Sequence, residues 1–288
     1  MNLRFAFLLV PVVALGLVTG CASDSSDSEG SGSGQTASLD DCQKGSITTY
    51  KDGVMTVGTD SPAYPPYFED DDPSNGKGFE SAVAYAIADR LGFSRSEVEW
   101  TVVPFNSSYA PGPKKFDFDV NQISITPARE KAVSFSIPYY TANQAVLVTE
   151  DSGIGEVSGL DELQDLKIGV QVGTTSLDAV EEEIDPTTAP RVYDNSNDVV
   201  SALKQGQVDA VVVDLPTAIY LRDVEVPNSS VAGQFEAPGG DQWGALLAKD
   251  SDLTKCVNAA LESMKDDGTL EEITTRWMSD AASAPELN

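Results

Sequence analysis

Histidine is absent from the 288-residue sequence, and cysteine occurs only three times. Without histidine, the chain lacks the commonest acid–base group and metal ligand of proteins. The three cysteines are too few and too scattered for a zinc cluster. We therefore expect neither a metal ion nor a cofactor in this protein.

Basic residues are also scarce, because 18 Lys and Arg stand against 46 Asp and Glu, for a net charge of −28. Such a charge argues against binding to nucleic acid and against electrostatic docking on anionic lipid. The hydrophobic fraction of 41% is nevertheless ordinary for a protein that buries a core. The length allows one large domain or two modest ones.

Residues 1–21 have the features of a targeting segment. Arg4 precedes an apolar run from Phe5 to Val18 that one proline and one glycine interrupt. The run is too short and wrongly flanked for a membrane span, and it predicts a signal peptide. It ends in VTGC (18–21), which resembles a bacterial lipobox and implies cleavage with lipid attachment at Cys21. The alternative is an ordinary secretory signal with an incidental cysteine. We expect an extracytoplasmic protein that this lipid anchors to the membrane.

Residues 22–38 (ASDSSDSEGSGSGQTAS) are poor in apolar residues and rich in serine, glycine and acids. This composition predicts a disordered tether, although it would also fit a linker between folded domains. A flexible segment of this length spans roughly 20–25 Å, which is enough to hold a folded domain just off a membrane.

From about residue 39 onward, segments with strand and helix periodicity alternate. The expected helices carry apolar stripes, and the expected strands are short runs rich in β-branched and apolar residues. This order indicates an α/β fold with doubly wound parallel sheets. The expected strands are 54–59, 98–103, 116–120, 167–172 and 208–213, with strand character over 133–148, and the expected helices are 78–92, 173–184, 198–205, 253–264 and 270–277.

The stretch 116–130 (FDFDVNQISITPARE) combines a strand with an unusual helix start. Apolar and polar residues alternate over 116–121, which predicts a strand with one buried face. Thr126 and the proline after it predict a helix N-terminus, with Thr126 as N-cap. Arg129 would then lie in the first turn, where a cation opposes the helix dipole. A guanidinium fixed there suits a carboxylate, although Arg129 could equally be a surface residue paired with Glu130 or another acid.

Four predicted strand ends carry polar groups, and ligands of doubly wound sheets bind at such ends. Arg129 and the backbone N–H groups of the turn 173–176 suit an anion. The carboxylates of Asp60 and Asp214 suit a cation. An amino acid would satisfy both sets. Each group also has a local explanation, because Asp214 and Thr175 could cap helices and Asp60 could stabilise its proline-rich turn.

Taken together, these motifs resemble the bacterial extracellular solute-binding proteins of polar amino acid ABC importers. The resemblance covers nearly all of residues 39–279 and implies two α/β lobes that close over the ligand like a hinged trap. It places the crossings near 141–143 and 240–243, so that lobe 1 comprises 39–142 with 241–288 and lobe 2 comprises 143–240. The segments that carry it are VGTD (57–60), GFESAVAYAIADRLG (78–92), FDFDVNQISITPAREKAVSFSIPYY (116–140), VGTTS (172–176), VDAVVVD (208–214) and DGTLEEITTRW (267–277).

The resemblance also implies how the head group of the ligand is held. Arg129 matches the arginine that binds the α-carboxylate, and Asp214 matches the acid that takes the α-ammonium. The groups that would assist at the carboxylate are Ser124, Thr126, Thr175 and Ser176.

The ligand side chain would lie between Tyr64 and Phe105, with Asp60 nearby, although Tyr67 competes with Tyr64 for this place. Gln122 stands where the family usually has glycine, so its amide could reach the pocket or could be satisfied inside the lobe. Because Arg129 is the one obvious cation of the predicted pocket, a neutral polar or basic ligand is favoured over Glu or Asp.

Cys42 and Cys256 would both lie in lobe 1 if the crossings are placed correctly. In an oxidising compartment they could form a disulfide that ties the N-terminus to the C-terminal helix. The alternatives are two free thiols or a buried Cys256.

The sequence thus predicts a monomeric, lipid-anchored receptor that captures a polar amino acid and delivers it to an ABC importer permease. It predicts a binding protein rather than an enzyme. Two other functions remain open on the same fold: an extracytoplasmic enzyme of the dehydratase type, and a sensor that presents its ligand to a membrane receptor.

Overall fold

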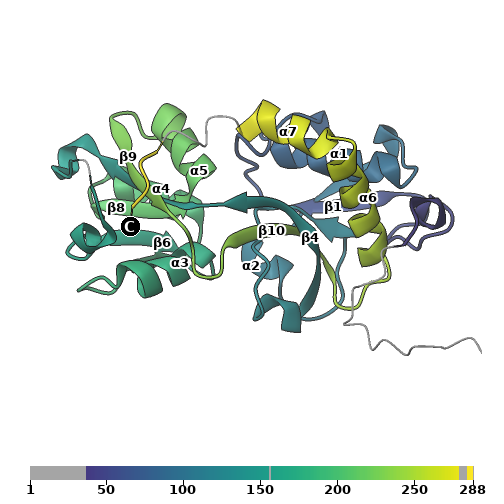
Figure 1. Cartoon of the computed structure of the whole chain (residues 1–288), viewed down its shortest axis with the longest axis horizontal. Coiled ribbons are helices and arrows are strands. Elements are labelled where there is room, and N and C mark those ends of the chain that lie inside the picture. The colour runs from purple at the N-terminus through teal and green to yellow at the C-terminus, as the bar shows by residue number, and fades with distance from the viewer. Residues whose placement is uncertain (1–36, 156, 279–283, 288) are drawn as a thin grey trace, which may run out of the picture. The chain divides into compact units, whose positions relative to one another are not determined.

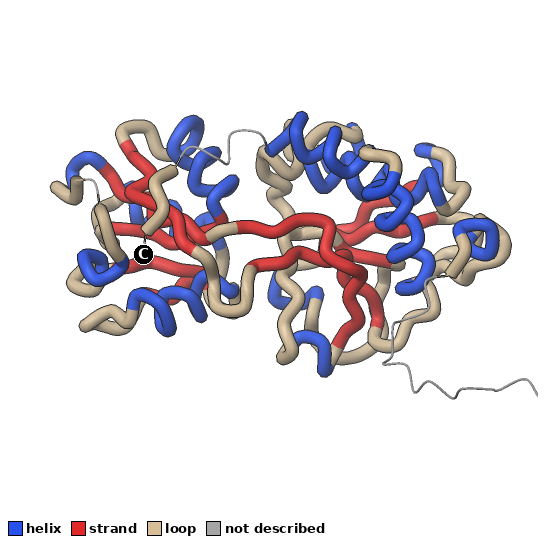
Figure 2. Tube along the Cα trace, viewed as in Figure 1, coloured by secondary structure: helices blue, strands red, loops and turns tan. Residues whose placement is uncertain are grey.

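Two five-stranded sheets organise the computed structural model, which describes residues 37–155, 157–278 and 284–287. The first sheet has the order β2-β1-β3-β10-β4, and the second has the order β7-β6-β8-β5-β9. Figures 1 and 2 show that helices flank both sheets and that two extended segments run between them. The described residues belong to one compact unit. The expected α/β class is confirmed.

Each sheet mixes parallel and antiparallel pairs, whereas the sequence predicted parallel sheets. In the first sheet, β1 pairs in parallel with β2 and β3, and β10 runs antiparallel to β3 and β4. In the second sheet, β6 pairs in parallel with β7 and β8, and β5 runs antiparallel to β8 and β9. The strands are β1 (Met55–Thr59), β2 (Val98–Val102), β3 (Phe118–Asp119), β4 (Val133–Ala142), β5 (Gln144–Thr149), β6 (Ile168–Gln171), β7 (Arg191–Tyr193), β8 (Ala210–Asp214), β9 (Ser229–Phe235) and β10 (Asp241–Ala248).

The chain passes between the sheets twice through these antiparallel strands. The first passage is Asn143, between β4 and β5, and the second is 236–240, between β9 and β10. Gly239 and Gly240 in the second passage both have φ of 77°, a conformation that glycine adopts without a steric penalty. The helices are α1 (Phe79–Arg90), α2 (Phe105–Ser108), α3 (Thr175–Ala179), α4 (Ser196–Lys204), α5 (Leu215–Tyr220), α6 (Thr254–Asp266) and α7 (Thr269–Met278).

The segment before Arg129 differs from its predicted form. β3 spans only Phe118–Asp119, and both of its faces are buried, with Asp117 and Asp119 exposed by 6% and 0%. β3 lies in the middle of its sheet, so neither of its edges is free. The Asp117 carboxylate is satisfied there because it accepts the backbone N–H groups of Tyr50 and Thr56, both at 2.6 Å.

The helix predicted from Thr126 is likewise shorter than expected. Only a single 3-10 turn forms at Arg129–Lys131, because the chain enters β4 at Val133. Thr126 still acts as a cap would, since its hydroxyl accepts the Arg129 N–H at 3.2 Å. Arg129 is only 8% exposed, so it is not the surface arginine of the alternative interpretation.

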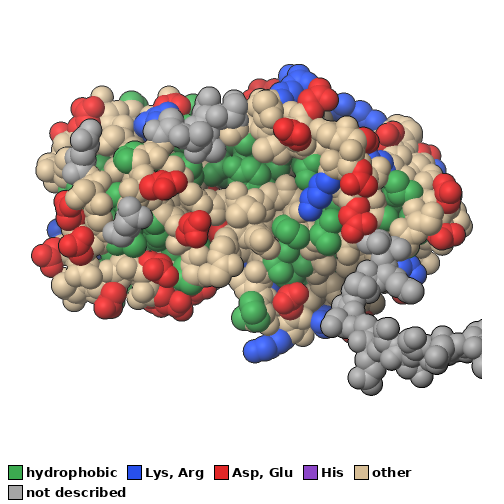
Figure 3. Space-filling model, viewed as in Figure 1, with side chains coloured by type: hydrophobic (Ala, Val, Ile, Leu, Met, Phe, Trp, Pro, Cys, Tyr) green, Lys and Arg blue, Asp and Glu red, His purple; other side chains and the backbone are tan. Residues whose placement is uncertain are grey.

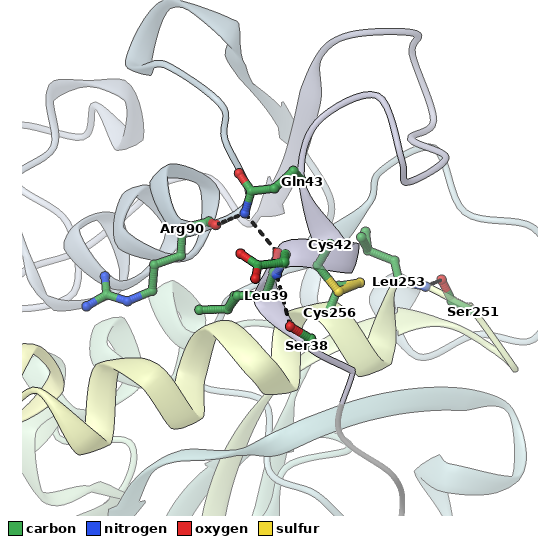
Figure 4. Close-up of a disulfide and its surroundings, with 9 residues drawn as sticks. Ser38, Leu39, Cys42, Gln43, Arg90, Ser251, Leu253 and Cys256 are labelled. Atoms are coloured by element: carbon green, nitrogen blue, oxygen red, sulfur yellow. Dashed lines mark hydrogen bonds between the residues drawn. A yellow bond between two sulfur atoms is a disulfide. The ribbon is translucent and has the colours of Figure 1, made fainter.

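Cys42 and Cys256 form a disulfide with a Cα–Cα distance of 5.4 Å (Figure 4). It joins the first described turn, Leu39–Cys42, to α6. Beside it, Gln43 Nε2 donates to the carbonyls of Leu39 and Arg90 at 2.9 and 3.0 Å. The N-terminal segment is thereby fixed to two helices of the first lobe.

The C-terminal segment was expected to belong to lobe 1, and this is wrong for residues 284–287. They lie along β9 of the second sheet, where Glu286 bridges Gln234 in parallel. The Gln234 N–H donates to the Pro285 carbonyl, and the Leu287 N–H donates to the Gln234 carbonyl, both at 2.8 Å. Leu287 is 5% exposed and belongs to the apolar core of the second lobe.

The predicted lipid-attachment site, Cys21, lies outside the described residues. Within the described ranges, no helix is both long and apolar enough to cross a membrane. On the face that Figure 3 shows, acidic side chains lie over both lobes, so the negative charge of the sequence is spread rather than gathered in one place.

Candidate functional site

A cavity of about 330 Å³ lies between the two lobes and draws its walls from both. It opens where strands of both sheets end: Asp60 follows β1, and Asp214 is the last residue of β8. Eight of the ten residues predicted to contact the ligand line it, namely Asp60, Tyr64, Phe105, Gln122, Ser124, Thr175, Ser176 and Asp214. The other two, Thr126 and Arg129, are not among its lining residues.

Arg129 lies directly behind the wall of the cavity. Its Nη1 donates to the carbonyl of Ser124 at 2.7 Å, and its Nη2 donates to the carbonyl of Gly173, in the other lobe, at 2.8 Å. The guanidinium stacks over the rings of Tyr109 and Phe105, 4.8 and 5.4 Å from their centroids. Burial lowers the pKa of Arg129, but arginine keeps its charge in proteins. The guanidinium charge therefore lies at one edge of the cavity.

Two hydroxyl groups from opposite lobes meet at the same edge. Ser124 Oγ lies 3.2 Å from Thr175 Oγ1. Thr175 was suspected of capping a helix, but Thr174 does so instead, because its hydroxyl accepts the N–H of Leu177 at 3.2 Å. The Thr175 hydroxyl is thus left to face Ser124 and the acids beside it.

The Asp214 carboxylate has an acidic neighbour. Gln144 Nε2 donates to Asp214 Oδ1 at 2.7 Å and to Asp241 Oδ2 at 2.6 Å. Thr175 Oγ1 donates to the same oxygen of Asp241 at 2.9 Å. Burial and the nearby Asp241 hold the pKa of Asp214 well above its usual range. Asp214 makes no side-chain capping bond to the described helix α5.

Asp60 makes local hydrogen bonds and also lines the cavity. Its Oδ1 accepts the Ser61 N–H at 2.7 Å and its Oδ2 accepts the Phe105 N–H at 3.0 Å. It therefore holds the proline-rich turn and the start of α2 in place while it lines the cavity.

Two tyrosines of the first lobe reach across to the second. Tyr64 Oη donates to Asn197 Oδ1, and the ring of Tyr64 lies 6.2 Å from that of Tyr220. Tyr67 Oη lies 2.8 Å from Thr217 Oγ1. Both tyrosines line the cavity, so they are neighbours in one wall rather than alternatives.

Gln122 is hydrogen-bonded inside the first lobe and also lines the cavity, so both alternatives given for it hold. Its backbone N–H donates to Glu80 Oε1 at 2.7 Å and its Nε2 donates to Glu80 Oε2, while the residue also lines the cavity. Its φ of 49° is in the left-handed region, where side chains other than glycine are strained. Because Glu80 takes Nε2, the amide oxygen of Gln122 is the group that remains for a ligand.

Several lining residues escaped prediction from the sequence. They include Asn195, Asn197, Lys204, Tyr220 and Glu225. Asn195 comes soon after β7, so the rule that ligands bind at strand ends would have found it if β7 had been recognised. Among the described residues, no group of three or more His, Cys, Asp or Glu side chains could hold a metal ion.

Comparison with known sequences identifies the family of this chain. The sequence profile of the bacterial extracellular solute-binding proteins, family 3, matches residues 55–280. The chain belongs to this family. Its two lobes are accordingly those of an amino-acid-binding protein of the periplasmic-binding-protein type.

Individual relatives are named as amino-acid-binding proteins. The L-cystine-binding protein TcyJ of Escherichia coli K12 is 30% identical over 78% of this chain and 82% of its own length. The arginine-binding extracellular protein ArtP of Bacillus subtilis is 31% identical over 77% of this chain and 85% of its own. Among solved structures, an ancestral arginine-binding protein bound to glutamine has a TM-score of 0.66 and 33% identity, covering 78% and 98% of the two chains. These relatives differ in ligand but share the binding function.

Proposed function

We propose that this protein captures a polar amino acid between its lobes and delivers it to the permease of an ABC importer, while a lipid at Cys21 holds it at the outer face of the membrane. The observation that carries the proposal is the convergence of groups from both lobes on one cavity. Ser124 comes from the first lobe, Thr175 and Asp214 come from the second, and Arg129 bonds to both.

The ligand's α-carboxylate would bind beside the Ser124 and Thr175 hydroxyls, with the charge of Arg129 behind them. Its α-ammonium would bind to Asp214. Because these groups belong to different lobes, a ligand that binds them all favours the closed state over the open one.

The groups around the ligand's side chain favour a neutral polar or basic amino acid. Asp60 and the amide oxygen of Gln122 are acceptors. Lys204, which also lines the cavity, is paired with Glu225 at 3.0 Å. The side-chain carboxylate of a Glu or Asp ligand would therefore face acceptors, with no unpaired cation among the described lining residues. Its desolvation would cost free energy of binding.

The test is thermal melting of the purified protein against each of the twenty amino acids. A ligand at a concentration 100 times its Kd should stabilise the folded protein by about 2.7 kcal/mol, which shifts the melting temperature by several degrees. Arg129→Ala should abolish the shift. Arg276→Ala, on α7 where Arg276 stacks on Trp277, is the matched control and should keep it.

If no amino acid stabilises the folded wild-type protein, the proposed site is wrong. Recovery of the ligand unchanged after incubation separates binding from turnover and so tests the enzyme of the dehydratase type. Metabolic labelling with a fatty acid tests the anchor, because Cys21→Ala should remove the label and release the protein from cells.

A further inference from the structure

Asp214 and Asp241 bring two carboxylates together at the hinge between the lobes. Asp241 is the first residue of β10, directly after the second passage between the sheets, and it is fully buried. Gln144 of β5 lies opposite Asp214 in the strand register, and its single amide nitrogen donates to both acids. Asp214 reaches the cavity, whereas Asp241 lies behind it.

Little positive charge surrounds the two acids. Among the described residues, no Lys or Arg forms an ion pair with either carboxylate. The charged or titratable groups that act on Asp214 are Asp241 and Arg129, with Tyr67 and Tyr140 on the first-lobe side. Arg129 donates to the carbonyl groups of Ser124 and Gly173 and to neither carboxylate. Two carboxylates that share one amide nitrogen, with no cation paired to either, favour holding one proton between them.

The hydrogen bonds of Asp241 agree with such a proton. Its Oδ2 accepts from Gln144 and Thr175, whereas its buried Oδ1 has no hydrogen-bond partner among the described residues. Asp214 Oδ1 and Asp241 Oδ2 lie on either side of one nitrogen, Gln144 Nε2, at 2.7 and 2.6 Å. A proton on this pair of carboxylates would remove one buried negative charge beside the unpaired Oδ1 of Asp241, whose burial is otherwise costly.

We propose that Asp214 and Asp241 share one proton while the site is empty, and that the α-ammonium of an amino acid displaces this proton into solvent when it binds. The inference rests on the proposed function and deepens it. The ammonium keeps its own protons and its positive charge replaces that of the released proton, so both carboxylates are ionised in the complex. Asp241 is then a positioning residue that makes ligand affinity rise with pH.

Calorimetric titration of the full protein with L-glutamine and with L-arginine measures the released proton. The titrations are run between pH 5.5 and 7.5 in buffers that differ in ionisation enthalpy. We expect release of up to one proton for each ligand bound. The Kd should fall by up to tenfold for each pH unit while the pair is protonated. In Asp241→Asn, which keeps an acceptor for Gln144 and Thr175, the release should disappear and the Kd should become independent of pH.

Glu80→Gln is the matched control, because Glu80 is a second fully buried acid near the cavity that contacts Gln122 and not the pair. It should leave the proton release unchanged. Binding without proton release, or release that persists in Asp241→Asn, would overturn the inference. Neither result would contradict the proposed amino-acid site.

Infrared spectroscopy of the ligand-free protein tests the pair even if neither probe binds. Asp241→Asn should remove one band of a protonated carboxyl group near neutral pH, and Glu80→Gln should leave that band in place. If Asp241→Asn removes no such band, the shared proton does not exist, whatever the protein binds. Failure of all twenty amino acids to stabilise the protein would instead overturn the proposed function.

Discussion

Glu80 is a carboxyl group buried entirely inside the first lobe, next to the cavity wall. Tyr139 Oη and two nitrogens of Gln122 donate to it. These bonds favour the ionised form, but burial outweighs them and raises the pKa of Glu80 to about 7. The acid therefore fixes Gln122 at an energetic cost that depends on pH.

This cost predicts how stability changes with pH. The folded state holds the Glu80 proton up to about pH 7, whereas an unfolded glutamate loses it near its ordinary pKa of 4.5. Stability therefore falls as pH rises through this window, because the folded state binds more protons there. At about 1.4 kcal/mol for each pKa unit, the loss amounts to about 3 kcal/mol.

Urea denaturation of the wild type and of Glu80→Gln from pH 4 to pH 8 measures the effect. The glutamine cannot ionise, so the free energy of unfolding of the variant should fall less steeply with pH. The difference in slope should correspond to at most one proton. Glu181→Gln, at an exposed site, is the control and should follow the wild type. Parallel curves for Glu80→Gln and the wild type would mean that Glu80 has the same pKa in the folded and unfolded states.

At the scale of elements, the C-terminal segment 284–287 acts as a short added strand of the second sheet. Leu287 fills a place over Gly233 of β9, where a Cβ atom on Gly233 would lie 2.4 Å from Leu287 Cγ. The absence of a side chain at Gly233 is thus what lets the C-terminal segment dock.

Removing the Leu287 side chain should therefore destabilise the protein. Leu287→Ala should lower the free energy of unfolding by about 2–4 kcal/mol, since buried Leu→Ala changes cost this much. Gly233→Ala should have a comparable effect because its methyl group displaces Leu287. Hydrogen exchange should become faster along β9 in both variants. Glu286→Ala removes a neighbouring exposed side chain and should be neutral; an equal effect of all three changes would exclude specific docking of Leu287.

The elements also show where sequence reasoning succeeds and where it ends. The stripe of Phe79, Val83 and Ile87 predicted a helix over 78–92, and α1 spans Phe79–Arg90, because periodicity over three turns is a local signal. β7 left no such signal, since it has three residues and its Arg191 and Val192 are exposed.

Features set by distant partners could not be read from local patterns. Asp117 is buried because Tyr50 and Thr56, more than sixty positions earlier, donate to it. The docking of Leu287 depends in the same way on Gly233. The strand-end rule pointed to Asp60, Asp214 and the turn with Thr175 and Ser176, and the family resemblance supplied the other predicted residues that line the cavity. Asp241 follows no predicted strand and was missed.

At the scale of the whole molecule, the lobes are joined by direct hydrogen bonds across the cavity. Tyr67 of the first lobe is 2% exposed, and its hydroxyl lies 2.8 Å from that of Thr217 on α5. Its ring packs edge-on against Trp243 of β10, with centroids 5.6 Å apart. Because this bond joins the two lobes, we expect it to form only in the closed state and to contribute to ligand affinity through closure.

Tyr67→Phe keeps the ring and removes this bond. A net loss of about 0.5–1.5 kcal/mol should raise the Kd of the amino acid by about 2- to 10-fold, measured by calorimetry at a fixed pH. Thr217→Val should have a similar effect, although Thr217 also lines the cavity. A double-mutant cycle separates the two roles: if the residues act through their mutual bond, Thr217→Val should cost much less in the Tyr67→Phe background. Fully additive effects would show instead that each hydroxyl acts on the ligand separately and that this bond does not hold the lobes closed.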